Sequence, residues 1–109
     1  MANTFKLKTK ANVGVSTVGI YTAPAATTTV VIGITMANTS GSGVNVGVGI
    51  TRAGTTEDVK LLKTAPIPQG SSLEFMAGNK IVLEATDTVT VDSDTNNSVD
   101  AALTIMEIT

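Results

Sequence analysis

The 109-residue sequence contains no cysteine, no histidine and no tryptophan, and only three aromatic residues. Without cysteine and histidine there is no thiolate zinc site, no disulfide framework, no Ser-His or Cys-His nucleophile pair and no imidazole acid or base. The carboxylates of Glu74, Glu84 and Asp87 are the remaining candidates for glycoside hydrolysis, but sugar-processing sites usually need aromatic platforms and tryptophan is absent. We therefore expect no enzyme activity and no cofactor.

Charged residues are also scarce. Seven basic and nine acidic side chains make up 15% of the chain, and the net charge is −2 with a mean hydropathy of +0.29. Globular domains usually carry about 25% charged residues. A surface with so few charges is prone to associate, so we expect a homo-oligomer or a place in a larger assembly. The low isoelectric point, 4.8, and the few aromatic residues argue against a nucleic-acid partner.

The charges divide between the two parts of the chain. Residues 1–63 hold six basic and two acidic side chains, whereas residues 64–109 hold one basic and seven acidic side chains, giving +4 and −6. Two interpretations are open. Folding brings the two parts together within one chain, or the basic half of one copy faces the acidic half of another.

Nothing in the sequence predicts a membrane protein. The first eight residues lack the apolar stretch of a signal peptide, and no run approaches 18 apolar residues. We expect a protein that is made in the cytoplasm and has no membrane partner.

β-Branched residues dominate what is present: 40 of the 109 residues are Thr, Val or Ile. They favour strands, and most segments alternate apolar and polar residues with period 2. Turn signals rich in Gly, Pro, Asn and Asp separate these segments. We predict an all-β, single-domain antiparallel β-sandwich over residues 1–109, jelly-roll-like, with eight to nine short strands. A smaller sandwich or a flattened barrel is the alternative. The predicted strand segments are 5–10, 13–20, 30–36, 44–50, 59–62, 72–76, 80–84, 88–92 and 99–108.

The alternation also predicts which side chains share a face. In segment 30–36 the apolar residues at even positions, Val30 and Ile32 among them, are expected on one face. A change of phase indicates a bulge near Ser16–Thr17. Met106 and Ile108 are expected to shift phase within the last strand.

One strand has an unusually small second face. Valine and isoleucine alternate from Val44 to Ile50, and the positions between them are Asn45, Gly47 and Gly49. A strand face made of glycine favours the close approach of another backbone or subunit. Asn45, Gly47 and Gly49 are therefore the predicted subunit interface.

Residues 1–12 form a possible N-terminal docking arm or strand. Phe5 faces one way, whereas Lys6, Lys8 and Lys10 face the other. Lysines on an edge strand discourage unwanted pairing, which is one explanation of the stripe. The other is docking on an acidic partner surface.

A loop near the C-terminus carries a weak calcium motif. Asp92, Asp94 and Asn96 have the D-x-D-x-N spacing with which oxygen ligands converge on one hard cation. However, Asn97 stands where an EF-hand needs Gly, and Leu103 stands where it needs the bidentate Glu. A polar hairpin loop with no metal is the other reading of this segment.

Four segments resemble the C-terminal half of small structural proteins of tailed bacteriophage virions. They are the proline-flanked loop and Gly-Ser turn in residues 65–73, Lys-Ile-Val-Leu-Glu in 80–84, Asp-Thr-Val-Thr-Val in 87–91, and the final strand 99–108, which ends in Glu-Ile. The resemblance covers about residues 59–108. It implies a virion component, most similar to a capsid decoration, or cement, protein.

Members of that class sit as trimers on the outer capsid shell and clamp neighbouring capsid subunits. The resemblance therefore implies a virion location on the outer capsid surface, the major capsid protein as partner, and synthesis in the host cytoplasm. A tail-, neck- or fibre-associated virion protein and a surface-binding adhesion module are the alternatives. The predicted capsid-docking residues are Phe5, Lys6, Lys8, Lys10, Pro66 and Pro68.

Overall fold

The structure, a computed structural model, describes residues 3–54, 56–75 and 80–109. These ranges contain nine β-strands and no helix, which confirms the all-β prediction. The strands are β1 (Asn3–Val13), β2 (Val18–Thr22), β3 (Thr28–Asn38), β4 (Val44–Arg52), β5 (Glu57–Ile67), β6 (Ser72–Phe75), β7 (Ile81–Leu83), β8 (Thr88–Ser93) and β9 (Val99–Ile108).

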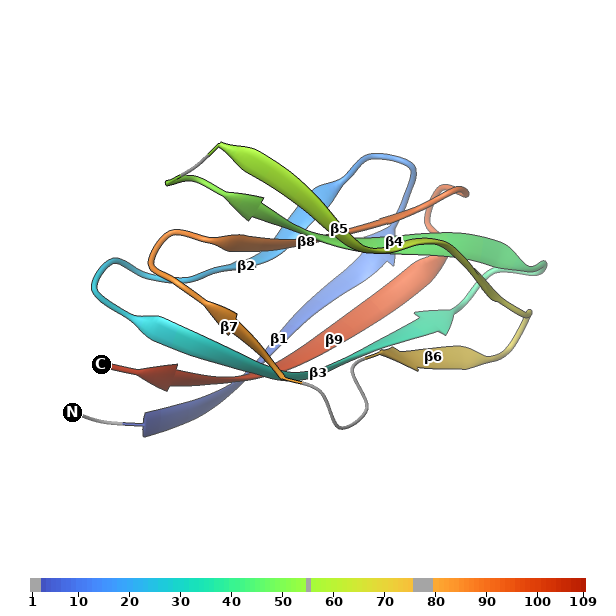
Figure 1. The fold of residues 1–109 in the computed structure, drawn as a ribbon. Helices are drawn as coiled ribbons and strands as arrows, with labels where there is room; N and C mark the ends of the chain where they lie inside the picture. The colour runs from blue at the N-terminus through green and yellow to red at the C-terminus, as the bar shows by residue number, and fades with distance from the viewer. Residues whose placement is uncertain (1–2, 55, 76–79) are drawn as a thin grey trace.

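The strands form two sheets that face each other, as Figure 1 shows. Sheet A has the order β1-β9-β3-β6, and β7 also pairs with β3; sheet B has the order β2-β8-β4-β5. All pairings are antiparallel. The molecule is elongated, with extents of 45 × 26 × 21 Å. The predicted antiparallel, jelly-roll-like β-sandwich is confirmed.

Alternating side chains of the central strands fill the space between the sheets. In β4, Val44, Val46, Val48 and Ile50 are all buried, so the predicted apolar face of this strand is confirmed. β-Branched side chains suit this position because they pack on a pleated surface. The fully buried side chains with the largest volume come from both sheets and include Met36, Ile67, Leu83, Leu103 and Ile105.

The predicted phase of β3 is wrong at its start. Val30 and Ile32 do not share the buried face; Val31 is 3% exposed instead, and the register of β3 against β9 shifts between Val31 and Gly33. This bulge reverses the alternation, so that Ile34 returns to the core. Because residues 30–32 are all apolar, alternation alone could not identify the buried ones.

The predicted bulge near Ser16–Thr17 is also wrong. β1 ends at Val13, and the chain crosses to sheet B, where β2 begins at Val18. The shift in register lies within β2, between Gly19 and Tyr21. A crossing between sheets and a bulge both reverse the apolar phase, which explains the error. The predicted strand 72–76 is found as β6, while Met76 lies outside the described residues.

β1 and β9 bring the two ends of the fold together. Asn3 at the start of β1 lies opposite Ile108 at the end of β9, and the pairing continues to Lys10 and Ala101. Figure 1 shows both ends at the same side of the molecule. In the described part of the chain, no helix has the length and hydropathy needed to cross a membrane.

Candidate interaction surfaces

β1 has a basic face and an apolar face, as predicted from its alternation. Lys6, Lys8 and Lys10 lie opposite β9 residues with buried side chains, so they project toward the inner side of sheet A. Phe5 and Leu7 lie on the outer side and are 69% and 65% exposed. Lysine is tolerated on the inner side because β1 is an edge strand and the neighbouring β2 of sheet B has only five residues.

Lys6 belongs to a polar network at this edge that links the two sheets. Its Nζ atom lies 2.9 Å from Oε1 of Glu107, and the hydroxyl of Tyr21 donates a hydrogen bond of 2.6 Å to Oε2. The same hydroxyl lies 2.8 Å from the Oγ1 atom of Thr29. Because its proton is given to Glu107, Tyr21 accepts the hydrogen bond from Thr29.

The network shifts the proton affinities of its members. Burial, with the hydrogen bond to the Glu107 carboxylate, raises the pKa of Tyr21 to about 12. The hydrogen bond from Tyr21, followed by the contact with Lys6, lowers the pKa of Glu107 below its usual value. Glu107 is therefore a carboxylate held in its charged form by two donors.

Sequence reasoning missed this network and predicted the wrong phase for the last residues of the final strand, although its bounds, 99–108, are confirmed. β9 alternates without interruption, and Glu107 continues the buried face of Leu103 and Ile105. The predicted phase shift of Met106 and Ile108 is therefore wrong, because a buried glutamate was read as an outward position. The signal that could have revealed the network is an acidic residue at a position that the alternation assigns to the buried face of the strand.

The side chains of the calcium motif each bind a different neighbouring segment. Asp92 Oδ2 accepts a hydrogen bond of 3.1 Å from the Thr17 hydroxyl, and Asp94 Oδ1 accepts one of 3.1 Å from the Asn45 amide. Asn96 Oδ1 lies 3.5 Å from the amide nitrogen of Val15. Among the described residues, no cluster of three or more acidic side chains is placed to hold a metal ion. The loop thus has a structural role in joining β8 to its neighbours.

The glycine face of β4 is occupied by the same chain. A Cβ atom on Gly47 would lie 2.6 Å from Asp92 Oδ1 and 3.2 Å from the Leu62 carbonyl oxygen. A Cβ atom on Gly49 would lie 2.8 Å from the Val59 carbonyl oxygen. Another backbone does approach these glycines, and it is that of β5. The space beside Gly47 and Gly49 is therefore filled without a second subunit.

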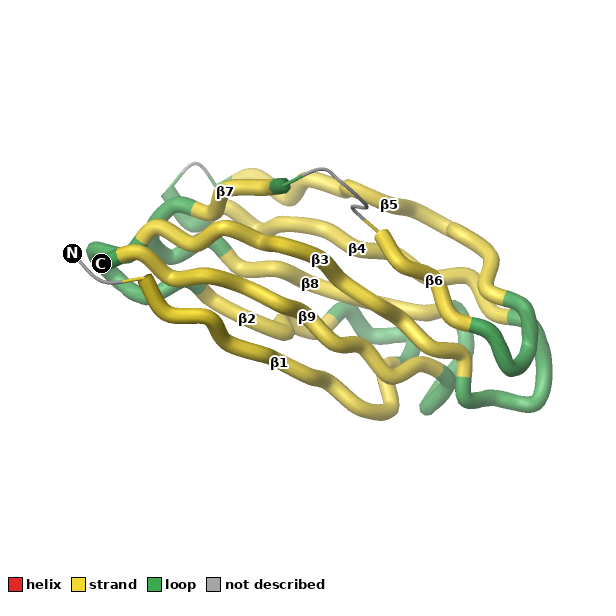
Figure 2. Tube along the Cα trace, turned by 90° about the horizontal axis from the view of Figure 1, so that it is seen from below, coloured by secondary structure: helices red, strands yellow, loops and turns green. Residues whose placement is uncertain are grey.

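Pro66 and Pro68 lie far from the lysine face of β1. Pro66 is on β5, where it pairs with Asn45, and Pro68 accepts a backbone hydrogen bond of 3.1 Å from Ser71 in the following turn. β5 is the edge of sheet B on the opposite side of the sandwich from β1, as Figure 2 shows. The predicted docking residues therefore form two separate surfaces, one at each edge.

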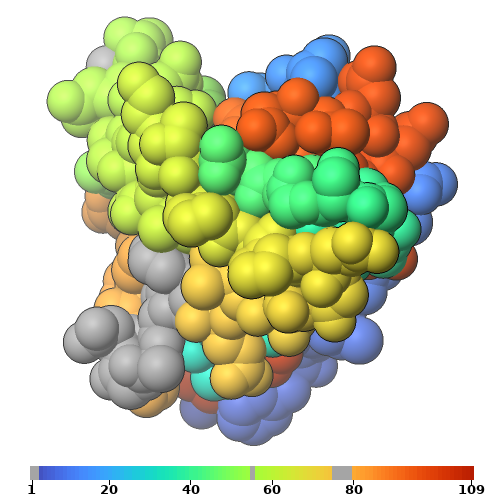
Figure 3. Space-filling view, turned by 90° about the vertical axis from the view of Figure 1, so that its right-hand side faces the viewer, coloured from blue at the N-terminus to red at the C-terminus, as the bar shows by residue number. Residues whose placement is uncertain are grey.

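The loops at one end of the sandwich are tied to each other. Asn38 donates from Nδ2 to the carbonyl oxygens of Ile67 and Ser42, at 2.9 and 2.8 Å. The amide of Asp94 donates to the carbonyl of Asn45 at 3.0 Å. Figure 3 looks onto this end, where the loops after β3, β5 and β8 gather. The Pro66–Pro68 segment is thus fixed by the hydrogen bond from Asn38 to the Ile67 carbonyl oxygen.

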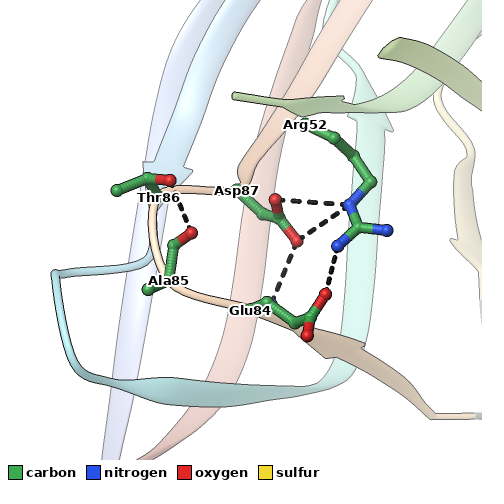
Figure 4. Close-up of polar contacts among 5 residues, drawn as sticks. All are labelled: Arg52, Glu84, Ala85, Thr86 and Asp87. Carbon is green, nitrogen blue, oxygen red and sulfur yellow. Dashed lines mark hydrogen bonds and ion pairs between the residues drawn. The ribbon is translucent and has the colours of Figure 1, made fainter. Parts of the chain in front are cut away.

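A third polar cluster lies where β4 ends and β8 begins. Arg52 contacts the carboxylates of Glu84 and Asp87, and its Nε lies 3.3 Å from Asp87 Oδ2, as Figure 4 shows. Asp87 also accepts a hydrogen bond of 3.0 Å from the Glu84 amide, which closes the turn between β7 and β8. These two carboxylates, considered above for glycoside hydrolysis, are both engaged by one arginine. The groove beside them measures about 450 Å³ and is lined by Ile50, Arg52, Val59, Val82, Glu84 and Asp87.

The ion pairs account for the division of charge along the sequence. Lys6 pairs with Glu107, Arg52 with Glu84 and Asp87, and Lys60 with Asp92. Each of these pairs joins a basic residue of the first part of the chain to an acidic residue of the second. Within the described ranges, folding therefore mixes the two halves in space.

No protein-family model matches the sequence, and no curated protein matches it either. Solved structures do match the fold. A chain of the structure described as "Bacillus endospore appendages form a novel family of disulfide-linked pili" matches with a TM-score of 0.59 and 15% identity, over 99% of this chain and 87% of that one.

Two viral structures match in the same range. A chain of the cyanophage Pam1 capsid asymmetric unit has a TM-score of 0.57 and 17% identity, over 95% of this chain and 85% of that chain. A chain of infectious bursal disease virus, Gx strain, has a TM-score of 0.57 and 13% identity, over 95% of this chain. The present chain spans only 33% of the latter. At these identities the likeness shows a shared fold: an antiparallel β-sandwich also found in viral capsid and pilus structures.

Proposed function

We propose that this protein is a structural virion protein that decorates the outer surface of a phage capsid and cements it. The observation that supports this most directly is the match with the cyanophage capsid asymmetric unit. It covers most of both chains, so a sandwich of similar length occurs there as a chain in its own right. The resemblance of residues 59–108 to small phage virion proteins points to the same class of function.

The placement of the candidate docking residues supports a clamping role. The lysine face of β1 and the Pro66–Pro68 segment lie at opposite edges of the sandwich. Two separated contact surfaces allow one molecule to touch two neighbouring capsid subunits at once. Neither subunit can then leave without breaking several contacts, because the second contact is held close by the first.

The docking contact on β1 is electrostatic. Lys8 is half-buried and Lys10 is exposed, and both project from the same side of β1, which is an edge strand among the described strands of sheet A. The matching partner surface is an acidic face of the major capsid protein. Lys6 contributes less to such a contact because its ammonium group already binds Glu107.

The cementing role is tested on particles with and without the protein. Decorated heads should withstand a higher temperature and a stronger osmotic shock than stripped heads, and adding back the purified protein should restore the difference. Equal stability of the two kinds of particle would contradict the role. Counting copies per particle separates the alternatives: hundreds indicate the capsid, whereas tens or fewer indicate a tail, neck or fibre protein.

The docking surface is tested with a charge reversal. The double variant K8E/K10E should bind stripped heads at least about 10-fold more weakly than the unchanged protein, since two contacts become repulsive. T22E/T51E/K80E is the matched control, because it changes the net charge by the same amount at exposed positions outside both proposed docking surfaces. Equal binding by the double and the triple variant would exclude β1 as the docking strand.

A pilus subunit is the second candidate, because the spore-appendage match has a TM-score of 0.59 and covers 99% of this chain. That structure is described as disulfide-linked, whereas these 109 residues contain no cysteine. A filament of this chain would therefore need non-covalent contacts. Electron microscopy of the purified protein distinguishes the two candidates, since filaments would favour the pilus and decorated heads the capsid.

A further inference from the structure

The outer face of sheet A carries a row of apolar side chains that crosses four strands. Phe5 on β1 pairs with Met106 on β9, Met106 pairs with Val30 on β3, and Val30 pairs with Val82 on β7. All four project away from the core, since their neighbours along each strand are on the inner side. Figure 2 looks onto this side of the molecule.

Two further residues, Leu7 and Ile108, extend the row. Phe5, Leu7 and Val82 are 69%, 65% and 58% exposed, and the other members are half-buried. From these exposures the group leaves roughly 500 Å² uncovered, in the range of patches that mark binding sites on soluble proteins. We call this group the apolar face; its members are Phe5, Leu7, Val30, Val82, Met106 and Ile108.

The apolar face excludes charge from its centre. Lys6 and Glu107, which neighbour it in sequence, both point to the inner side of sheet A. On the outer side of the described strands, Glu74 lies five residues along from Val30, and Asp100 lies six residues along from Met106, about 17–20 Å away. At the β7 edge, Lys80 and Glu84 lie two residues before and after Val82, and Arg52 and Glu84 line the groove beside Val82, so this rim is charged.

The outer face of sheet B differs. Its side chains are mainly Thr51, Thr88, Thr90 and Asp92, together with the covered glycines of β4. A polar face suits contact with water, whereas an apolar patch of this size is often a binding surface. The two outer faces of the sandwich therefore have different uses.

We propose that the apolar face packs against the same face of a second copy of this protein. A sheet surface with no charge at its centre can pair with itself: two copies can stack about a twofold axis, with the sheets about 10 Å apart and no like charges opposed at the centre. The roughly 500 Å² of apolar surface from each copy would supply more than half of the about 800 Å² per partner of a standard interface, and the polar rim the rest.

This contact is independent of capsid docking. The lysines proposed for docking leave β1 on the side opposite to Phe5 and Leu7, so a dimer keeps them accessible. The apolar face also replaces Gly47 and Gly49 as the place where copies meet, because β5 already covers those glycines. Self-association can therefore fail while docking succeeds, and the reverse.

The test is the oligomeric state of the purified protein, measured by sedimentation over a range of concentrations. The unchanged protein should form a dimer. L7E/V82E places charges on both copies within the apolar face and should weaken the dimer at least about 100-fold, since each position removes an exposed anchor and adds repulsion. T22E/T51E adds the same charge to the exposed outer face of sheet B and should leave the dimer unchanged.

Both substituted residues of L7E/V82E are mostly exposed, so this variant should keep the fold, which its circular dichroism and melting temperature check. F5A provides a milder second variant, with a weaker dimer and no added charge. The proposed dimer differs from the trimer that the resemblance to decoration proteins implies, so a monomeric or trimeric unchanged protein would overturn the proposal. So would a dimer that survives both L7E/V82E and F5A, or one that T22E/T51E weakens equally.

Discussion

At the scale of single residues, Tyr21 and Glu107 connect the two sheets at the β1 edge. Tyr21 lies on β2 of sheet B and Glu107 on β9 of sheet A, and both side chains are buried. A charged hydrogen bond between buried groups is stronger than a neutral one, and leaving one partner without the other is costly. The pair therefore both stabilises the sandwich and makes it sensitive to acid.

Replacing Tyr21 with Phe should destabilise the fold. The ring still fills its space, but Glu107 loses the donor at Oε2 and keeps only Lys6. We expect a loss of about 1–2 kcal/mol in the free energy of unfolding, measured with urea. T88V is the control, because it removes the exposed hydrogen bond between Thr22 and Thr88 and should cost much less. Equal losses in the two variants would contradict the importance of the buried pair.

The lowered pKa of Glu107 gives a direction for the pH dependence. The unfolded chain binds a proton at Glu107 more readily than the folded chain, so stability rises with pH in that range. The contribution is complete above the ordinary glutamate pKa, about 4.3, and is lost as the pH falls through the lowered native value. E107Q should be less stable than the unchanged protein at pH 7, and the difference should shrink below pH 4. A constant difference across this range would refute the linkage.

Single residues also show where sequence reasoning stops. The alternation of polar and apolar residues identified the faces of β1 and β4, because only one phase of each strand is apolar. It failed at Val30 and Val31, where both phases are apolar, and at Glu107, where the buried side chain is acidic. Which residue turns inward at such places depends on partners in other strands, and those become known only in the folded structure.

At the scale of elements, β4 is the strand most constrained by its neighbours. It pairs with β5 and β8, and its two glycines leave room for the carbonyl groups and side chains of these strands. The sequence correctly indicated the close approach of a backbone at Gly47 and Gly49. The sequence could not identify that backbone, because a strand face made of glycine is the same whether the approaching backbone belongs to this chain or to another.

G49A should be strongly destabilising. The added methyl group would lie 2.8 Å from the Val59 carbonyl oxygen, a backbone atom that can move only if β5 moves. We expect a loss of about 2–3 kcal/mol, the upper part of the range for overpacking. G33A is the control: its methyl group meets nothing within 4 Å, and stability should change little, measured by thermal unfolding. A harmless G49A would show that β5 can shift away from β4.

The loop after β8 should not respond to calcium. Its acidic side chains are directed to Thr17 and Asn45 rather than toward a shared centre. We expect no change in melting temperature when calcium is added to millimolar concentration. Magnesium at the same concentration controls for ionic strength, and a rise specific to calcium would restore the metal-binding interpretation of Asp92, Asp94 and Asn96.

At the scale of the whole molecule, the sandwich separates two kinds of surface. The basic edge of β1 and the apolar face share a strand but point to opposite sides of it. Seven of the sixteen charged side chains take part in the ion pairs that join the two halves of the chain. Scarcity of charge, a property of the sequence alone, predicts association as a tendency, while the surface proposed for it could be identified only from the sheet register.

The two proposed contacts should respond in opposite ways to salt. Screening shortens the reach of exposed charges from about 10 Å at 0.1 M to about 3 Å at 1 M, so docking through Lys8 and Lys10 should weaken. The apolar contact between copies should be unchanged or stronger. Binding to stripped heads and the dimer equilibrium, each measured at both salt concentrations, check this. If both weaken in parallel, the apolar face is not the contact between copies.

The pairing of Asn3 with Ile108 also has a mechanical consequence. A force that pulls these two strand ends apart acts on one hydrogen-bonded pair of β1 and β9 at a time, and so separates the strands pair by pair. A force that pulls the Val13 end of β1 away from the Ile108 end of β9 would instead act along the strands and load all their hydrogen-bonded pairs at once. We therefore expect a clamp built on this sandwich to resist force well when the force acts along β1 and β9, and poorly when it acts on Asn3 and Ile108.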